Sequence, residues 1–253
     1  MSRSWKLPRF DLLEVTLIVV VAVMCIIMFI ATLIAPHYQR MVERDWLLAK
    51  YGPAHYSFGV EELVIRDFFQ DRKGGVFVDV GASHYKKDSN TYYLESQLGW
   101  SGLAVDAVEE YEADYERYRP HTRFVARFVS DRSNGELTLF VPSDKRQSSD
   151  WIRPEYGAAQ RRSVATVTLN DLLVQEHISA FDLLALDIEL SEPKALAGFD
   201  IERYRPALVC VEAWQPVRQQ VLDYFARHGY TVVGKYLRTD SMNLYYAPLP
   251  SSR

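Results

Sequence analysis

Cysteine is scarce in this chain of 253 residues, which contains only Cys25 and Cys210. The two lie in very different segments, so the sequence argues against a disulfide framework and favours a reducing compartment. A strong excess of charge is also missing, because the formal net charge is −4. Without a basic field, nucleic acid is not expected as a partner. No internal repeat is present, and the length suits one domain with a substantial core.

Glycine-rich phosphate loops are absent as well. The apolar run Val76–Val80 predicts a buried strand and is followed by a single glycine, Gly81, while the next glycine is Gly99. The G-x-G-x-x-G pattern of dinucleotide sites therefore fails, and no G-x-x-x-x-G-K-[ST] loop occurs. A pyrophosphate needs several close approaches to backbone amides, whereas an adenosine cofactor without phosphates needs only one. The pattern favours S-adenosylmethionine, whose amino-acid part also needs polar partners such as Asp79.

The N-terminal region does contain a long run without charge, Val15 to Ala35 (VTLIVVVAVMCIIMFIATLIA). A helix of this length would measure about 30 Å, the thickness of a bilayer core. We expect a single transmembrane helix over residues 15–35 after a flank of residues 1–14, with a signal sequence or a core helix as the alternatives. Basic residues are nearly balanced on its two sides and do not set the orientation. A cytosolic cofactor would require the C-terminal domain to face the cytoplasm.

Residues 36–58 are expected to form a juxtamembrane helix and linker. Tyr38–Lys50 (YQRMVERDWLLAK) places apolar residues among charges, which is typical of a helix on the membrane surface or of a connector packed on the soluble domain. Gly52-Pro53 ends this helix. Pairing of the N-terminal helices would allow a homo-oligomer.

Residues 59–253 are expected to form one domain in which strands and helices alternate. Several strand candidates are nearly continuous apolar runs, as strands covered on both faces of a parallel sheet must be. The pattern predicts an α/β sandwich with a mostly parallel sheet. The polar segment 142–162 is expected to be a functional or disordered loop. We expect strands at Val76–Val80, Gly102–Asp106, Arg123–Ala126, Glu136–Val141, Val164–Thr168, Asp182–Asp187, Ala207–Glu212, Thr231–Lys235 and Asn243–Ala247, and helices at Val60–Gln70, Ser89–Gln97, Glu110–Tyr118, Asn170–Glu176, Lys194–Ala197 and Pro216–His228.

Acidic residues lie at the ends of four of these strands. They are Asp79, Asp106, the pair Asp187 and Glu189, and Glu212. Ligands of an open parallel sheet bind beyond the carboxyl ends of its strands, and an acid at the end of the second strand suits the ribose hydroxyls. Any one of these acids could instead cap the following helix. As a set in this order, they favour a binding site.

The chain resembles the FkbM-type family of S-adenosylmethionine-dependent methyltransferases over about residues 51–247, in the runs FVDVGAS, SNTYYLESQLGWSGLAVDA, VATVTLNDLL, FDLLALDIELSEPKALAGFD and ALVCVEAW. The resemblance implies a class I methyltransferase fold, which is a Rossmann-like, mostly parallel sheet of seven strands between helices with the last strand antiparallel. It also implies a set of site residues. These are Asp79, Gly81 and Ala82 beside the methionine portion, Asp106 at the ribose, Ser89, Asn90 and Thr91 near the methyl end, and Asp187 and Glu189 near the methyl group or the acceptor hydroxyl.

Three positions depart from the family pattern. Ser83-His84-Tyr85 stands where the family has Asn-x-Gly or Asp-Gly, and Asp106-Ala107 stands where it has Glu-Pro. Leu190 replaces the glycine of the DxEGxE run. The last change bears on the backbone geometry there and on any acceptor-side role of Glu189 and Glu192. The tetrapeptide from His84 to Lys87 is where we expect this chain to differ in substrate.

Methyl transfer to an oxygen needs orientation, a dry site and a general base. One candidate base is His84, because imidazole ordinarily titrates near neutral pH, although it could equally be a surface loop residue. The other is Asp187, acting directly or through a divalent metal ion held with Glu189.

A membrane span would hold the active site at the bilayer, so we expect O-methylation of a hydroxyl on a lipid or lipid-linked saccharide. Four arginines would then meet an anionic head group, or else belong to a solvated loop: Arg146, Arg153, Arg161 and Arg162. Two other functions remain open. One is a membrane-anchored, metal-dependent glycosyltransferase, and the other is a catalytically inactive membrane-tethered domain of the same fold.

Overall fold

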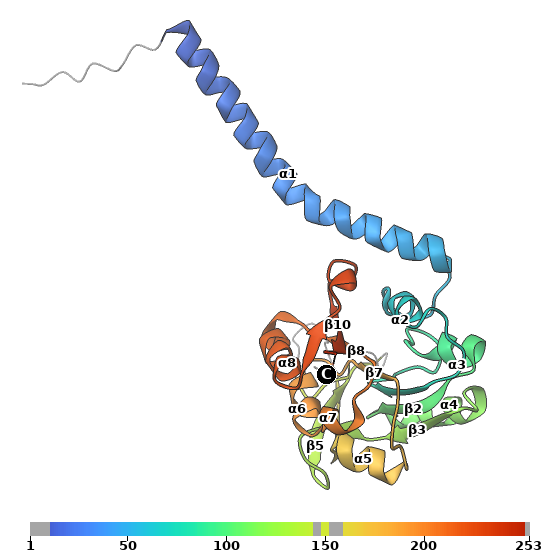
Figure 1. Ribbon diagram of the computed structural model, residues 1–253. Coiled ribbons are helices and arrows are strands. Elements are labelled where there is room, and N and C mark those ends of the chain that lie inside the picture. Colours follow the sequence, from blue (N-terminus) through green and yellow to red (C-terminus); the bar gives the residue numbers. More distant parts are fainter. Residues whose placement is uncertain (1–10, 144–147, 152–158, 251–253) are drawn as a thin grey trace, which may run out of the picture.

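A central sheet of seven strands organises the chain from residue 76 onward in this computed structural model (Figure 1). The structure describes residues 11–143, 148–151 and 159–250. Along the sheet the order is β3 (Thr122–Ala126), β2 (Ser101–Asp106), β1 (Val76–Val80), β7 (Leu183–Leu186), β8 (Leu208–Glu212), β10 (Asn243–Pro248) and β9 (Tyr230–Val232). Strand β10 pairs antiparallel with β8 and β9, and the other pairs are parallel. The predicted fold, with its antiparallel last strand, is confirmed.

Helices cover both faces of this sheet because alternate strand residues are apolar on both sides. On β1, Val78 and Val80 join a core cluster with residues of α5 to α8, whereas Phe77 joins a second cluster with residues of α2, α3 and the end of α1. The helices after α1 are α2 (Glu61–Phe69), α3 (Tyr92–Leu98), α4 (Glu112–Tyr118), α5 (Leu169–Gln175), α6 (Glu192–Ala197), α7 (Ile201–Tyr204) and α8 (Gln215–Arg227), with 3₁₀ turns η1 (Glu109–Tyr111) and η3 (Gly234–Tyr236).

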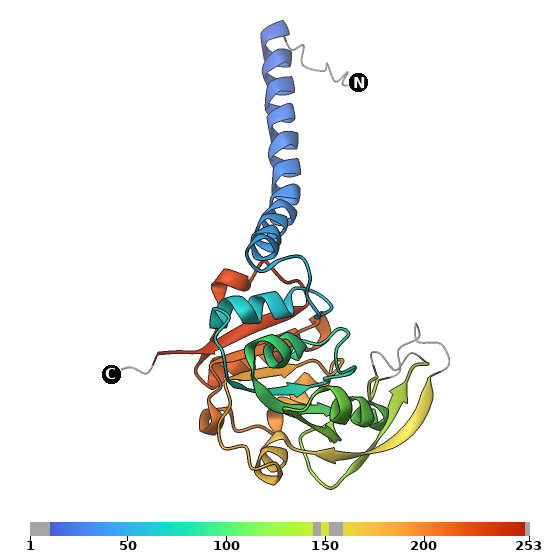
Figure 2. The ribbon, with the colours of Figure 1, turned by 90° about the vertical axis from the view of Figure 1, so that its right-hand side faces the viewer.

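Three further strands form a separate small sheet in the order β4-β6-β5 (Figure 2). These are β4 (Phe128–Val129), β5 (Glu136–Val141) and β6 (Gln160–Val167). Two of the predicted strands thus lie outside the main sheet. The burial pattern of β6 explains this, because its residues are mostly exposed or half-buried, unlike those of a strand covered on both faces. Residues 160–162, expected in a loop, begin β6.

The helix predicted over Ser89–Gln97 begins later, at Tyr92. The hydroxyl oxygen of Ser89 accepts hydrogen bonds from the backbone amides of Thr91 and Tyr92, at 3.3 and 3.1 Å. A serine bonded to nearby backbone amides in this way favours a turn over a helix. The residues before Tyr92 therefore belong to a long loop between β1 and α3, which borders the sheet edge.

The first helix, α1, runs without interruption from Leu12 to Tyr51. The transmembrane helix was expected to end at Ala35, before Pro36, yet the helix continues past both residues. A proline removes one helical hydrogen bond and bends a helix, and the ribbon of α1 bends part-way along (Figure 1). Within Leu12–Ala35, an 18-residue window has a mean hydropathy of 3.3 and none of that window is buried, so this part is long and apolar enough to cross a membrane.

The other end of α1 is attached to the domain through Asp67 of α2. The Asp67 carboxylate accepts hydrogen bonds from Lys50 Nζ at 2.8 Å, from the hydroxyl of Tyr51 at 2.9 Å and from the hydroxyl of Tyr236 at 2.7 Å, and it also pairs with Lys235. Burial works to raise the pKa of the Asp67 carboxyl, but the hydrogen bonds from Lys235 and Lys50 outweigh it and hold the pKa well below its usual range. Asp67 therefore joins α1, α2 and η3 as one unit.

Candidate active site

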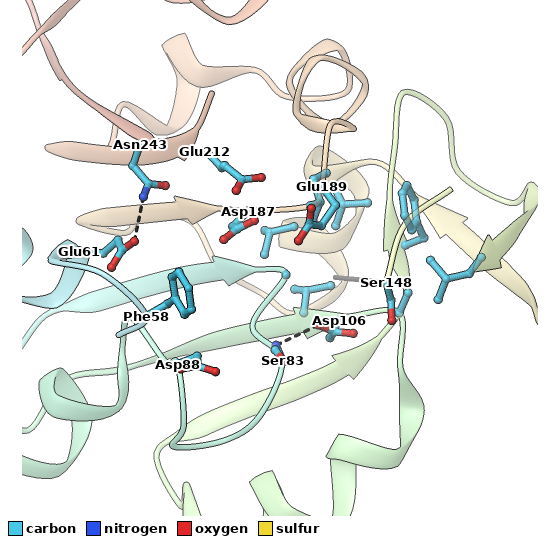
Figure 3. Close-up of a pocket in the computed structure, with 18 of the residues that line it drawn as sticks. Phe58, Glu61, Ser83, Asp88, Asp106, Ser148, Asp187, Glu189, Glu212 and Asn243 are labelled. Carbon is cyan, nitrogen blue, oxygen red and sulfur yellow. Dashed lines mark hydrogen bonds between the residues drawn. The ribbon is translucent and has the colours of Figure 1, made fainter. Parts of the chain in front are cut away.

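A cavity of about 320 Å³ lies along the carboxyl ends of the main-sheet strands. This volume is at the lower end of the range for small-molecule sites. The cavity crosses neighbouring strands in their spatial order (Figure 3). Its lining includes Arg127 after β3, Asp106 on β2, Gly81 after β1, Asp187 after β7, Glu212 on β8 and Asn243 on β10. The order of β2, β1 and β7 brings the predicted strand-end acids to one edge, as the sequence suggested.

Gly81 has the backbone conformation that only glycine adopts without strain. Its φ is +84°, and a β-carbon there would lie 1.7 Å from the carbonyl oxygen of Asp187. The amides of Gly81 and Ala82 both donate to the carbonyl of Val105, at 2.8 and 3.1 Å. Gly81 lines the cavity, whereas Ala82 is buried beside it and does not.

Asp106 lines the cavity with its carboxylate held by backbone amides. The amide of Ser83 donates to Oδ2 at 2.9 Å and the amide of Val108 donates to Oδ1 at 2.8 Å. Burial raises the pKa of Asp106 to about 6. Each carboxylate oxygen has a second lone pair, so the ionised side chain can still accept hydrogen bonds from ligand hydroxyls.

Asp79 lies behind the cavity and is not part of its lining. It is buried, and its Oδ2 accepts a hydrogen bond from the hydroxyl of Thr91 at 2.7 Å. Burial raises the pKa of Asp79 to about 6. Ser89 and Asn90 also do not line the cavity. The structure thus places Asp79 and the segment Ser89–Thr91 together as a support for the loop.

A buried arginine completes this support. Arg119 forms an ion pair with Glu95 of α3, and it donates hydrogen bonds to the Thr91 hydroxyl at 3.2 Å and to the carbonyl of Tyr85 at 2.9 Å. Arg119 is only 1 % exposed. From the same loop, Ser83 and Asp88 are the side chains that face the cavity.

His84 lies outside the cavity lining and is engaged with its own loop. Its Nδ1 accepts hydrogen bonds from the amides of Lys86 and Lys87, at 3.1 and 3.0 Å, and its ring stacks on Tyr85 at 4.5 Å between centroids. When Nδ1 is the acceptor, the neutral ring carries its hydrogen on Nε2. Neither nitrogen of His84 is then available to take a proton from an acceptor, which argues against the role of base.

Three carboxyl groups meet at the ends of β7 and β8. Oxygens of Asp187, Glu192 and Glu212 all lie within 4.8 Å of one another. Glu192 Oε1 accepts a hydrogen bond from the amide of Ile188 at 2.9 Å. Burial raises the pKa values of Glu192 and Glu212 to about 8. Burial and the nearby Glu212 carboxylate raise the pKa of Asp187 well above its usual range, and the two side chains share a hydrogen bond.

The turn Glu189-Leu190 keeps a glycine-type backbone without glycine. Both residues lie in the left-handed region, with φ of +56° and +78°. The hydroxyl of Ser149 donates to the carbonyl of Glu189 at 2.9 Å, and the hydroxyl of Ser191 donates to Asp150 at 2.6 Å. The side chain of Glu189 lines the cavity. The leucine at the family's glycine position therefore preserves the turn, which neighbouring hydrogen bonds hold in place.

The predicted arginines lie away from the cavity lining wherever the structure describes them. Arg162 of β6 donates to Glu110 at 2.7 Å, and the Arg161 guanidinium lies 5.5 Å from the centroid of the Phe140 ring. Arg146 and Arg153 are outside the described residues.

The sequence did not predict several of the residues that line the cavity. Phe58, Glu61, Trp214 and Asn243 all face the cavity, and the Asn243 amide donates to Glu61 Oε1 at 2.9 Å (Figure 3). Glu61 belongs to an amphipathic helical pattern that carries no functional signal. For Asn243 the sequence does hold one signal, which is a polar residue at the start of the apolar strand Asn243–Ala247. The start of this strand lies at the same edge of the sheet as the cavity.

The chain matches known methyltransferases in sequence. The sequence profile described as the Methyltransferase FkbM domain matches residues 79–232. The 31-O-demethyl-FK506 methyltransferase FkbM of Streptomyces tacrolimicus is 25 % identical over 231 residues, which covers 72 % of this chain and 86 % of that protein.

Two solved structures overlap the chain more loosely. One is a TehB-like SAM-dependent methyltransferase from Corynebacterium glutamicum (15 % identity, TM-score 0.42, covering 84 % of this chain and 98 % of that one). The other is precorrin-6y C5,15-methyltransferase from Geobacter metallireducens (9 % identity, TM-score 0.44, covering 75 % and 87 %). Structural similarities this low support no conclusion about function.

Proposed function

Because the chain belongs to the FkbM methyltransferase family, we propose that it uses S-adenosylmethionine to O-methylate a hydroxyl of a lipid or lipid-linked saccharide. S-adenosylmethionine-dependent methyl transfer is the activity of the family, and it replaces the glycosyltransferase alternative. The observation that carries the finer proposal is the Asp187 carboxyl group. It lies in the cavity next to Gly81, on a domain attached to an exposed apolar helix.

The cavity residues fit this cofactor in the order in which they lie. Asp106 presents a carboxylate for the ribose hydroxyls, and Gly81 lines the cavity beside it, where the lack of a side chain lets the end of β7 pack against the turn. The apolar side chains of Phe128 and Leu139 lie on the β3 side and suit an adenine ring. Asp187 lies on the other side of Gly81. With Asp106 toward the ribose and Asp187 toward the acceptor, these residues would hold S-adenosylmethionine, which when bound would supply an electrophilic methyl group on sulfur.

The chemistry needs one proton to be removed from the acceptor. As the hydroxyl oxygen forms a bond to the methyl carbon, the carbon–sulfur bond breaks and S-adenosylhomocysteine is left. The hydroxyl proton passes to the pair formed by Asp187 and Glu212, which acts as base in its singly ionised form. Their shared hydrogen bond raises the pKa of Asp187 and works to lower that of Glu212, although burial still holds the Glu212 pKa at about 8. Asp187 is the member placed next to Gly81, and we assign it as the base.

Exposed apolar residues of α1 support a membrane location for the acceptor. The span Leu12–Ala35 has 24 residues, about 36 Å of helix, and none of its most apolar window is buried. A core helix would be covered by the domain. A cleaved signal sequence is less consistent with a helix that continues unbroken to Tyr51 and is tied to Asp67. We place the domain on the cytoplasmic side, where the cofactor is available.

The test is methyl transfer by the full-length protein in nanodiscs. Protein, methyl-labelled S-adenosylmethionine and lipids extracted from native membranes are incubated, and the products are identified by mass spectrometry. We expect label in an organic-soluble product whose methyl ether survives mild alkali, which would cleave a methyl ester. Asp187→Asn should abolish transfer while cofactor binding, measured by calorimetry, persists.

Other outcomes would contradict parts of the proposal. Label on nitrogen or in an ester excludes O-methylation of a hydroxyl. Transfer only to water-soluble acceptors excludes the lipid. Full activity of Asp187→Asn excludes Asp187 as the base.

A further inference from the structure

A cluster of three carboxyl groups is formed by Asp187, Glu192 and Glu212. In the described part of the chain, no ion pair joins any of them to a basic side chain. Lys194, on the same helix as Glu192, pairs with Asp150 instead. Asp187 directly follows β7, Glu212 ends the adjacent strand β8, and Glu192 is the first residue of α6. Three rigid elements therefore bring like-charged groups together, which is unfavourable unless something compensates the charge.

Two carboxylate oxygens of this cluster are unsatisfied. Glu192 Oε2 and Glu212 Oε2 are buried without a hydrogen-bond partner in the described part of the chain. Glu192 is 0 % exposed and Glu212 is 7 % exposed. The other oxygen of Glu192 is fixed by the amide of Ile188. A buried oxygen without a partner is costly, so these two atoms indicate a missing ligand rather than a finished ion-pair network.

From this geometry we infer that Asp187, Glu192 and Glu212 bind one divalent cation of the oxygen-preferring kind, such as Mn²⁺, Mg²⁺ or Ca²⁺. Their ligand atoms lie within 4.8 Å of one another. Two oxygens on opposite sides of Ca²⁺ are about 5 Å apart, and about 4 Å apart on Mg²⁺. One coordination sphere thus accounts for the spacing. The absence of histidine and cysteine from the cluster disfavours Zn²⁺ and Cu²⁺.

The assignment changes one ligand relative to the sequence expectation. The sequence suggested Asp187 with Glu189, whereas the cluster contains Glu192 in its place. The left-handed turn at Glu189-Leu190 separates the two glutamates and lets Glu192 enter the cluster from the start of α6. Cation binding itself does not depend on the acceptor. Its catalytic use, which is to hold the acceptor oxygen beside Asp187, rests on the proposed function.

The experiment is a Mn²⁺ titration of the full-length protein in detergent after treatment with a chelator, followed by electron paramagnetic resonance of the free ion. We expect one saturable site in the wild-type protein. Glu192→Gln and Glu212→Gln should each weaken it by about tenfold or more, since even outer-shell changes cost that much. Glu116→Gln, an exposed acid on α4, is the matched control and should bind as the wild type does. Circular dichroism checks that each variant is folded.

Several results would overturn the inference. Without saturable Mn²⁺ binding to the wild-type protein, the three carboxyl groups are held together by protons alone. Unchanged binding in both glutamine variants excludes these ligands, and a loss in Glu189→Gln with none in Glu192→Gln restores the sequence assignment. Calorimetry of S-adenosylmethionine binding on the same chelator-treated samples separates the two proposals, because failure of the cation site leaves cofactor binding intact.

Discussion

The carbonyl oxygen of Asp187 occupies the space in which a side chain on Gly81 would begin, only 1.7 Å from the position of a β-carbon. The end of β7 therefore packs directly against the turn that follows β1. Because the cavity is lined by both residues, the turn and the candidate base cannot move independently.

Gly81→Ala is expected to destabilise the protein by about 3 kcal/mol and to abolish cofactor binding, since it adds strain at positive φ to a backbone collision. Thermal unfolding and calorimetry measure the two effects. Gly234→Ala is the control, because a β-carbon at Gly234 meets nothing within 4 Å and its φ is not positive. Equal stability of the two variants would contradict the close packing.

Binding of S-adenosylmethionine is expected to weaken as the pH falls through about 6. The pKa of Asp106 in the free protein is about 6, and only its ionised form accepts from both ribose hydroxyls. Affinity should therefore be constant above pH 7 and about tenfold weaker at pH 5. Calorimetry across this range measures the profile. Asp106→Asn should weaken binding and flatten it.

Asp79 provides the control for that profile, because its pKa is also about 6. Asp79 does not line the cavity, so Asp79→Asn should keep the pH dependence. If the dependence disappears in Asp79→Asn and survives in Asp106→Asn, Asp106 is not the ribose acceptor.

Arg119→Met is expected to destabilise the protein by about 3–5 kcal/mol, because it leaves the buried Glu95 carboxylate unpaired. Replacing both residues by methionine should cost less than the single change. Arg123→Met breaks an exposed pair with Glu176 and should cost under about 1 kcal/mol. Urea unfolding of the three variants measures these differences. A small effect of Arg119→Met would show that the loop after β1 does not depend on this pair.

Leu190→Gly is expected to be nearly neutral for stability. Relief of left-handed strain at φ +78°, worth about 1–2 kcal/mol, offsets the lost contacts of the side chain. Leu137→Gly removes the same side chain from a half-buried strand position without positive φ and should cost clearly more. Thermal unfolding of both compares them. Equal losses would mean that Leu190 is not strained.

The sequence revealed the main sheet because its strands carry their own signal. Runs such as LLALD and ALVCVE are apolar up to the acid at their end, and only strands covered on both faces require this. The same pattern marks where the strands end, and acids stand at those ends. The sequence therefore predicted that Asp106, Asp187 and Glu212 lie close together. Strand β6 was expected as a strand, but its half-exposed residues do not indicate which sheet the strand joins.

The sequence did not predict the direction in which the side chains of the loops point. Ser89 and Thr91 are polar residues in a loop at the sheet edge, and polarity alone does not tell whether they face a ligand or a buried partner such as Asp79. His84 is similar, since its bonds to the amides of Lys86 and Lys87 depend on a turn that no pattern announces. Glu192 was named only for an acceptor-side role, and its place in the carboxyl cluster was not predicted, because an acid at a helix start has an ordinary explanation as a capping residue.

The unbroken helix α1 sets a fixed distance between the N-terminal apolar segment and the domain. Its 40 residues amount to about 60 Å of rod, and the contacts of Asp67 fix one end of that rod to the domain. With the first 24 residues of α1, Leu12–Ala35, placed in a bilayer as proposed, the rest of the helix sets the height of the cavity above the lipid surface. An acceptor would then be selected partly by how far its hydroxyl projects from the membrane, so that lengthening or shortening α1 by whole turns would shift the preferred substrate without touching a residue of the cavity.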